Sequence, residues 1–225
     1  MVGAAVQDYL KVIYKLSLSE QRCTPTLVAE RLGVSAAAVT KMIKRLQELN
    51  LVSYQRSQEL SLTHAGEKIA LEMIRHHRLL EVYLMEALGY TWDQVDAEAE
   101  QLEHVISEEF EERIDRMLGY PTHDPHGDPI PTKEGHIAEE ARDRLTTVSP
   151  GQSAVVRRVR DGNPEMLQYL GRLGLYPNTA VEVLDQLPFG GPILIRVGGA
   201  EHAIGRDLAD NVFITTEASA APAAS

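Results

Sequence analysis

Two carboxylates and an imidazole stand close enough to act together in the stretch Glu100-Gln-Leu-Glu103-His104. On a helix, residues i, i+3 and i+4 share one face, so these three side chains would converge. An apolar stripe beside them would leave the charges partly buried, where carboxylates without a partner are costly and a divalent cation would offset the cost. Residues 91–117 hold ten Asp/Glu against two Arg, so an acidic, solvated helical face is an equally open interpretation.

Further ligand types occur elsewhere in the chain. His77 and Glu81 stand one helical turn apart, and Asp8 could supply a ligand from near the start of the sequence. A carboxylate and histidine cluster with an open position could also activate water, which makes a metallohydrolase one alternative. The sequence contains no glycine-rich phosphate loop, nucleophile elbow or HExxH pattern, however, and we therefore predict that the protein is not an enzyme.

The elements that would position these residues begin with three short helices, predicted at residues 6–16, 26–32 and 35–50 from apolar residues at helical spacing. Thr24 and Ser35 suit helix N-caps, and Gly33 suits a helix end. Two strand-like runs, at residues 51–54 and 60–63, flank a polar segment and predict a β-hairpin. A helix-turn-helix followed by a hairpin is a winged helix, and its second helix would enter the major groove of double-stranded DNA.

The DNA-binding interpretation names specific side chains. The residues expected to face base edges are Ser35, Ala37, Ala38, Thr40 and Lys41, and those expected to lie nearer phosphates are Lys44 and Arg56. Residues 1–60 hold eight Lys/Arg and five Asp/Glu, although the whole chain carries a net charge of −11, so the basic charge is concentrated where DNA would bind. A winged helix used for protein contacts, with a merely solvated basic face, is the alternative.

The rest of the chain divides into a helical part and a β-rich part. Helices are predicted from residue 66 to 88 and from 92 to 118, an irregular proline-rich loop at 121–131, and a short acidic helix at 134–144. The two longer helices should pack together and could form a dimer. Beyond Ser149, short β-like runs at 154–159, 180–184, 193–197 and 212–216, with one helix at 164–173, predict a small SH3-like barrel.

The predicted fold class is therefore mainly α with a small β component. The expected domains are a winged helix-turn-helix at residues 1–66, a helical metal-binding and dimerisation domain at 67–145, and an SH3-like domain at 149–217. An Ala-rich tail at 218–225 is expected to be disordered. A chain of 225 residues that is 44% apolar and 24% charged is typical of a packed globular protein.

Composition also bears on the compartment. Cys23 is the single cysteine and cannot form an internal disulfide, which is typical of a reducing compartment, so a cytoplasmic protein is expected. The N-terminal residues lack the basic and apolar segments of a signal peptide, and no run of about 18 uncharged apolar residues occurs. We therefore expect no membrane role.

Several of these motifs together resemble the diphtheria toxin repressor family of metal-dependent transcription regulators. They are DYLKVIY at 8–14, VAERL at 28–32, residues 35–46, LSLT at 60–63 with Gly66, HHRLLE at 76–81, EAEQLEH at 98–104 and GDPIP at 127–131. The resemblance extends from about residue 4 to 217, and the C-terminal part resembles the family's SH3-like, FeoA-like domain. It implies a homodimer that binds operator DNA when loaded with metal and represses metal-uptake genes.

The resemblance also implies a primary metal site made of Asp8, Glu100, Glu103 and His104. Iron-responsive members of the family carry methionine and cysteine at the positions of Asp8 and Glu100, so this chain resembles the manganese-responsive branch. Carboxylate oxygen in place of sulfur favours a harder ion. Mn(II) is the expected metal, and Fe(II), one step higher in the divalent affinity series, is the alternative.

Lys11 departs from the pattern of the short, two-domain manganese regulators, which have a carboxylate at this position that completes a paired-ion site. A cation cannot ligate a metal. The longer, three-domain relatives have a secondary site around the equivalents of His77 and Glu81, completed by the SH3-like domain. Asp161 is the candidate for that group, with Asp96 as another, although Asp161 could equally cap the helix that follows it.

A mechanism follows from these positions. Without metal, Asp8 and the pair Glu100 and Glu103 would repel, leaving the DNA-binding domain free to move, whereas a bound metal would clamp them and hold two winged helices about 34–36 Å apart in a dimer. A winged-helix regulator that senses a non-metal ligand is the nearer alternative, and a metallohydrolase the more distant one. The response of DNA binding to chelator and added Mn(II) distinguishes the metal-dependent regulator from both.

Overall fold

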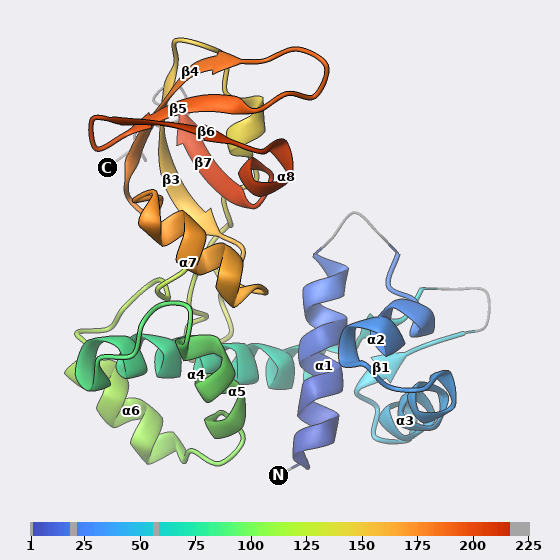
Figure 1. The fold of residues 1–225 in the computed structure, drawn as a ribbon. Helices are drawn as coiled ribbons and strands as arrows, with labels where there is room; N and C mark the ends of the chain where they lie inside the picture. The colour runs from blue at the N-terminus through green and yellow to red at the C-terminus, as the bar shows by residue number, and fades with distance from the viewer. Residues whose placement is uncertain (1, 19–21, 56–58, 217–225) are drawn as a thin grey trace, which may run out of the picture. The chain divides into compact units, whose positions relative to one another are not determined.

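The computed structural model describes residues 2–18, 22–55 and 59–216. Two compact units interleave along the sequence (Figure 1). The first unit comprises Met1–His77, Glu100–Glu112 and Pro131–Ile137, and the second comprises Arg78–Ala99, Arg113–Ile130 and Ala138–Ser225. Arg56 and the predicted disordered tail at 218–225 lie outside the described residues.

The first unit contains the predicted winged helix. Its elements are α1 (Ala4–Ser17), α2 (Pro25–Leu32), α3 (Ala36–Glu48), and the antiparallel hairpin of β1 (Val52–Ser53) and β2 (Ser61–Leu62). The side chain of Thr24 accepts a hydrogen bond from the Leu27 amide, and that of Ser35 accepts one from the Ala38 amide. Gly33 ends α2 in the left-handed conformation, with φ of 63°. The caps and the turn residue therefore set the boundaries of the helix-turn-helix, as predicted.

A close backbone approach fastens the hairpin to the start of α4 (His64–Leu88). The Thr63 amide donates to the carbonyl of Leu51 at 3.0 Å, and a Cβ placed on Gly66 would lie 2.0 Å from that same carbonyl oxygen. Only glycine fits at this position. The apolar core contains Leu10, Val39 and Leu46, whose side chains are fully buried, so α1 and α3 pack against a common core.

The second unit contains a five-stranded antiparallel sheet in the order β6-β5-β4-β3-β7. The strands are β3 (Ser153–Val159), β4 (Ala180–Gln186), β5 (Ile193–Val197), β6 (Ala200–Ile204) and β7 (Val212–Thr216), accompanied by α7 (Pro164–Arg172), α8 (Arg206–Ala209) and the 3-10 turn η1 (Leu145–Thr147). Alternate β5 residues are buried, as in a sheet with one core face. The predicted SH3-like arrangement is confirmed, although β6 was missed because Glu201 and His202 break its apolar alternation.

The single helix predicted from residue 92 to 118 is wrong. Two helices replace it, α5 (Val95–Leu102) and α6 (Glu108–Met117). The Ser107 side chain accepts a hydrogen bond from the Phe110 amide at 3.2 Å and starts the second helix, while three glutamates in its first turn favour its positive end. Phe110 and Met117 of α6 are 38% and 58% exposed. Glu103 and His104 therefore lie in the turn between two helices.

The acidic helix predicted at residues 134–144 is also wrong, since this segment forms no helix in the structure. Contacts within the second unit hold its latter part extended. The Asp143 carbonyl accepts from the Ile214 amide at 2.8 Å, and the Glu140 carboxylate lies 3.7 Å from Arg78 and 3.6 Å from Arg158. Tertiary hydrogen bonds and ion pairs outweigh the local helix propensity of these residues.

Within the described residues, none of the helices combines the length and the apolar character that a bilayer span requires.

Candidate metal centre

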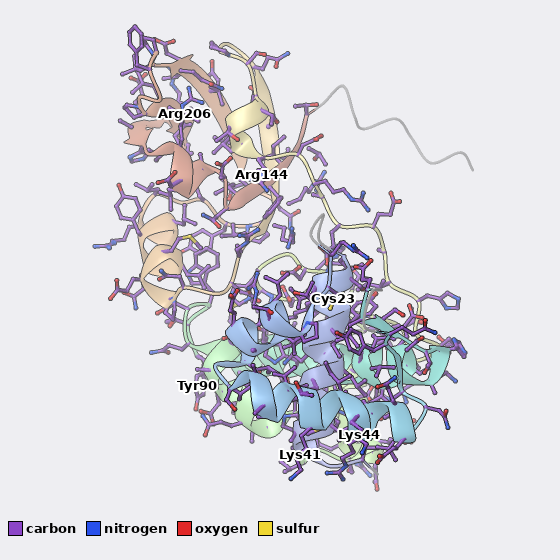
Figure 2. All side chains as sticks on the ribbon, turned by 90° about the vertical axis from the view of Figure 1, so that its right-hand side faces the viewer. Cys23, Lys41, Lys44, Tyr90, Arg144 and Arg206 are labelled. Atoms are coloured by element: carbon purple, nitrogen blue, oxygen red, sulfur yellow. The ribbon has the colours of Figure 1, made fainter. Side chains whose placement is uncertain are left out.

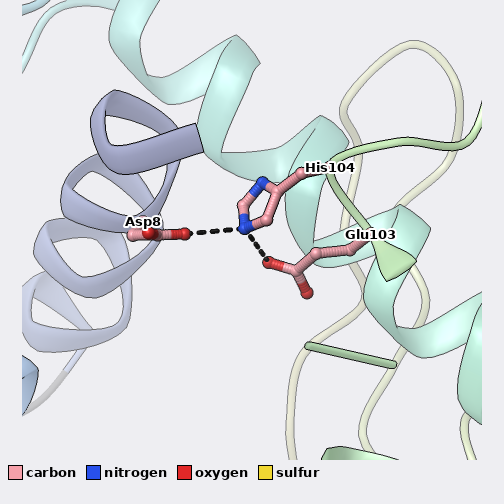
Figure 3. Close-up of side chains that lie close together, drawn as sticks. All are labelled: Asp8, Glu103 and His104. Carbon is pink, nitrogen blue, oxygen red and sulfur yellow. Dashed lines mark ion pairs between the residues drawn. The ribbon is translucent and has the colours of Figure 1, made fainter. Parts of the chain in front are cut away.

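Two elements of the first unit bring Asp8, Glu103 and His104 together. Asp8 lies on α1, and the other two residues lie in the turn after α5 (Figure 3). His104 Nε2 is 2.8 Å from Asp8 Oδ1 and 3.7 Å from Glu103 Oε1. The three side chains offer ligand atoms within 4.8 Å of one another. Three of the four residues predicted for the primary site thus form one group.

Glu100 belongs to a neighbouring group in the same unit, with His77 and Glu103. His77 Nδ1 lies 2.5 Å from Glu103 Oε2 and 3.6 Å from Glu100 Oε2. Glu103 is shared, because one carboxylate oxygen faces His104 and the other faces His77. His77 was predicted for the secondary site, and the structure places it beside the primary residues.

The side chain of Lys11 fills the space between these carboxylates. Its amine donates to Glu100 Oε2 at 2.7 Å and to the two oxygens of Glu103 at 2.9 and 2.7 Å, and lies 3.3 Å from His77 Nδ1. Lys11 is only 5% exposed. The expectation that Asp8 repels Glu100 and Glu103 in the absence of metal omitted this cation, which offsets part of their negative charge.

Charge and burial shift the ionisation of this cluster. Burial raises the pKa of the Asp8 carboxyl. The His104 ring opposes this increase, and the carboxylates of Glu100 and Glu103 add to it. Burial would also raise the pKa of Glu103, but His77 and Lys11 outweigh it and lower that pKa. Burial would lower the pKa of the Lys11 amine, but Glu103 and Glu100 raise it. Glu103 is thus held as an anion and Lys11 as a cation.

Buried side chains of the first unit fix the turn that carries Glu103. His76 Nδ1 lies 3.2 Å from the carbonyl oxygen of Glu103, and its Nε2 lies 3.2 Å from Glu111 Oε2. Arg75 donates to Glu111 Oε1 at 2.6 Å and to the carbonyl of Pro131 at 2.8 Å. Sequence reasoning missed this network, because Glu111 carries no spacing signal that distinguishes it from the other acids of α6.

The donor set fits a divalent metal. Carboxylate oxygen and imidazole nitrogen are ligands that Mn(II) and Fe(II) accept. Asp8 Oδ1 is buried and makes no hydrogen bond to any described residue, despite its proximity to His104. Such an atom gains from a cation. The residues of the group Asp8, Glu103 and His104 are therefore suited to hold one.

A second buried cluster lies in the second unit and was not predicted. Glu81 on α4 joins Asp124 and His126 of the loop after α6, with ligand atoms within 4.8 Å of one another, and all three residues are buried. His126 Nε2 lies 2.6 Å from the Trp92 carbonyl, and its Nδ1 lies 3.5 Å from Glu81 Oε1. One nitrogen of His126 thus points into the cluster.

Backbone contacts hold the loop of this second cluster in place. Asp124 Oδ1 accepts hydrogen bonds from the amides of His126 at 2.8 Å and Asp128 at 3.0 Å. The His126 carbonyl accepts from the Val159 amide of β3 at 2.8 Å. A Cβ on Gly127, whose φ is 91°, would lie 2.0 Å from a β3 carbonyl oxygen, so glycine is required there.

The ionisation of the second cluster is unusual. Burial would lower the pKa of His126, but Glu81 and then Asp124 raise it to about 10. Burial raises the pKa of Asp124 well above its ordinary value, and the carboxylates of Glu81 and Asp128 add to the shift. The imidazole therefore supplies positive charge that partly neutralises the buried acids, and a divalent ion bound there could neutralise them instead.

The other residues predicted for the secondary site have different positions. Asp96 on α5 offers an oxygen within 4.8 Å of Glu81. Asp161 lies in the loop before α7 and joins none of the ligand groups found among the described residues. It does not cap α7 either, because Asn163 accepts the hydrogen bond from the Met166 amide. Asp161 as a ligand stays a prediction.

The predicted DNA-binding residues lie on one exposed surface. Ser35, Ala37, Ala38, Thr40, Lys41 and Lys44 are all exposed at and along α3. Figure 2 shows Lys41 and Lys44 projecting from this helix. Val39 and Ile43 of the same helix are buried, so α3 presents a polar face away from its own core.

Three family descriptions match successive parts of the chain. Residues 1–60 match "Iron dependent repressor, N-terminal DNA binding domain", and residues 63–132 match "Iron dependent repressor, metal binding and dimerisation domain". Residues 144–216 match the FeoA domain. The three matches follow one another in the order expected from the sequence.

Individual proteins are similar over almost the whole chain. The iron-dependent repressor IdeR of Mycobacterium tuberculosis (strain ATCC 25618 / H37Rv) is 33% identical over 220 residues, covering 92% of this chain and 94% of the relative. A solved manganese-dependent transcriptional repressor in complex with manganese is 37% identical with a TM-score of 0.87, covering 94% of this chain and 99% of the other. ScaR with bound Cd2+ is 33% identical with a TM-score of 0.80, covering 94% and 99%.

Proposed function

Because the chain belongs to the diphtheria toxin repressor family of metal-dependent regulators, we propose that it is a homodimeric repressor that binds operator DNA when Mn(II) occupies its metal centre. Its family consists of transcriptional repressors rather than enzymes. Neither a metallohydrolase nor a regulator of a non-metal ligand is favoured. Repression of metal-uptake genes in the cytoplasm is part of the proposal.

The observation that carries the proposal is the group of Asp8, Glu103 and His104, in which α1 of the winged helix meets the turn after α5. A bound divalent ion supplies positive charge and directional ligand bonds at this group. Asp8 then ties the DNA-binding elements to the turn, and His76 and Glu111 hold that turn from behind. Ordering both winged helices of a dimer lowers the entropic cost of binding two half-sites about 34–36 Å apart.

The choice of Mn(II) rests on the ligand atoms. The four predicted primary residues offer oxygen and nitrogen and no sulfur, and such hard ligands suit Mn(II) and, one step higher in affinity, Fe(II). The similar structures include a manganese-dependent repressor with manganese bound. Fe(II) is the second metal of the proposal, since curated relatives are named as iron-dependent repressors.

A second ion is proposed at Glu81, Asp124 and His126. Their burial, their ligand atoms within 4.8 Å of one another, and the His126 nitrogen that faces Glu81 at 3.5 Å support it. This proposal replaces His77, which contacts Glu103, with Asp124 and His126, while Asp96 and Asp161 remain candidate additional ligands. Loss of the ion at this second site should weaken the metal dependence of DNA binding but leave the site at Asp8, Glu103 and His104 occupied.

The dimer would form through the helical domain. Each unit leaves large apolar side chains exposed on or beside its helices, including Val105 and Phe110 in the first unit and Leu88 and Met117 in the second. Contiguous apolar patches mark surfaces that associate, and these residues are candidates for such a patch in the proposed dimer.

DNA shift assays across a series of divalent metals test the proposed function. We expect chelator to abolish specific DNA binding and Mn(II) to restore it. His104→Ala should lose the Mn(II) response while remaining folded, because His104 lies partly exposed at the edge of the cluster. Glu108→Gln, which removes an exposed acid elsewhere in the first unit, is the matched control. DNA binding that ignores both chelator and Mn(II) would contradict the proposal.

A further inference from the structure

Lys11 occupies a position that a metal ion could take. His77, Glu100 and Glu103 together offer three ligand atoms within 4.8 Å of one another. This group could itself hold a cation. The Lys11 amine contacts all three residues, at 3.3 Å from His77, 2.7 Å from Glu100 and 2.7 Å from Glu103. An amine offers three hydrogens, and Glu100 Oε2 and the two oxygens of Glu103 accept them.

The position filled by Lys11 adjoins the one proposed for the metal. Glu103 is common to both ligand groups. Its Oε1 lies 2.9 Å from the Lys11 amine and 3.7 Å from His104 Nε2. The cluster therefore has two neighbouring cation positions that share one carboxylate, as paired-ion centres do, and the chain's own side chain fills one of them.

The charges of the cluster agree with a single ion. The ionised carboxylates of Asp8, Glu100 and Glu103 contribute three negative charges, and Lys11 contributes one positive charge. The remaining two negative charges match one divalent cation. With a neutral or acidic residue at position 11, three or four negative charges would remain, which would attract a second ion because buried charges need compensation.

We propose that the amine of Lys11 is a tethered cation that permanently fills the second position of this centre and limits it to one divalent ion. The inference rests on the proposed metal-binding function of Asp8, Glu103 and His104. Lys11 stays bound to Glu100 and Glu103 when the metal enters, and it keeps α1 close to α5 before the metal arrives. Metal binding then adds a second link to a contact that already exists.

Calorimetric titration with Mn(II) tests the stoichiometry. A parent carrying His126→Ala, which removes the second site, should bind one ion per chain. Lys11→Glu in this parent should bind two ions, and Lys11→Met should bind its first ion at least about tenfold more tightly, because a positive charge beside the ion is gone. Lys15→Met, on the exposed side of α1, is the matched control and should bind one ion with the parent's affinity.

The outcomes separate the two proposals. One ion with unchanged affinity in both Lys11 variants would overturn the inference alone, whereas no Mn(II) binding by the parent would overturn the proposed function and the inference with it. If the variants misfold, crystals of the unaltered protein with Mn(II) test the proposal instead. Anomalous scattering from its Mn(II) crystals should show one peak beside Glu103 with the Lys11 amine still in contact. Two peaks about 4 Å apart there would refute the proposal.

Discussion

Lys11 and Glu103 should be energetically coupled in the protein freed of metal by chelator. The Glu103 side chain is fully buried and that of Lys11 is 6% exposed, with 2.7 Å between amine and carboxylate. Removing one partner of a buried pair costs up to about 3–5 kcal/mol, of which His77 beside Glu103 and Glu100 beside Lys11 offset a part. Lys11→Met or Glu103→Gln alone should therefore lower the free energy of unfolding by up to that amount, or Tm by up to about 6–20 °C for a chain of this length.

The double variant distinguishes a specific pair from two independent losses. The double variant leaves neither buried charge unpaired, and Glu100, whose side chain is 53% exposed, can be solvated, so Lys11→Met with Glu103→Gln should cost about 2–3 kcal/mol less than the sum of the single variants. Guanidinium unfolding followed by circular dichroism, at fixed protomer concentration, measures all four proteins. Lys15→Met, on the same helix, should change little. Single costs below about 1 kcal/mol that add independently would refute the reasoning.

Three further predictions concern selectivity, DNA contact and pH. Asp8→Met with Glu100→Cys should shift the metal response from Mn(II) toward Fe(II) or Co(II), since softer ligands replace carboxylates, and an unchanged ranking in DNA shift assays would place selectivity elsewhere. Lys44→Ala should weaken binding to all DNA sequences alike and reduce the salt slope by about 1, whereas a sequence-dependent loss would contradict a phosphate contact. In the presence of chelator, the pKa of His126 in the folded protein is raised to about 10, whereas in the unfolded chain it is near 6.5. The charged imidazole therefore stabilises the fold fully below about pH 6.5. This stabilisation is lost as the pH rises toward 10, by up to about 1.4 kcal/mol per pH unit. The stability advantage over His126→Gln should shrink between pH 7 and 10, and a constant difference would argue against a charged imidazole.

Local signals were sufficient for the winged helix and most of the β-rich segment. Thr24, Ser35 and Gly33 define helix ends through caps and turn geometry that depend on few neighbours. The alternation of β5 and the Asn-Pro start of α7 are likewise local. These features could be read from the sequence because each is decided within a few residues.

Features that depend on distant partners could not be predicted in the same way. The helix expected at residues 134–144 gave way to an extended chain, because Asp143 hydrogen-bonds to Ile214 and Glu140 pairs with Arg78. The break before α6 depends on the Ser107 cap, which a continuous acidic pattern conceals. Tertiary contacts outweighed the local helix propensity at residues 134–144, and the acidic pattern hid the helix boundary before α6.

The candidate metal centre shows the same division. Spacing brought Glu100, Glu103 and His104 together, Asp8 was named as a possible ligand from 92 or more positions away, and the resemblance joined it to this group. The role of Lys11 was foreseen only as a missing ligand, because its burial between two carboxylates depends on how α1 packs in the first unit. Asp124 and His126 lie in a proline-rich loop with no periodicity, where a signal was available only in the paired Asp-Pro-His residue types.

Calorimetric titration with Mn(II), in the absence and in the presence of an operator selected from random DNA, tests the central claim most directly. If the metal prepares the winged helices for DNA, the two affinities are linked, and each ligand must raise the affinity for the other by the same factor. We predict that operator DNA tightens Mn(II) binding by about 5–150-fold, the usual range of such coupling, and that Mn(II) tightens DNA binding equally. Mn(II) affinity that is identical with and without the operator would contradict the proposed function.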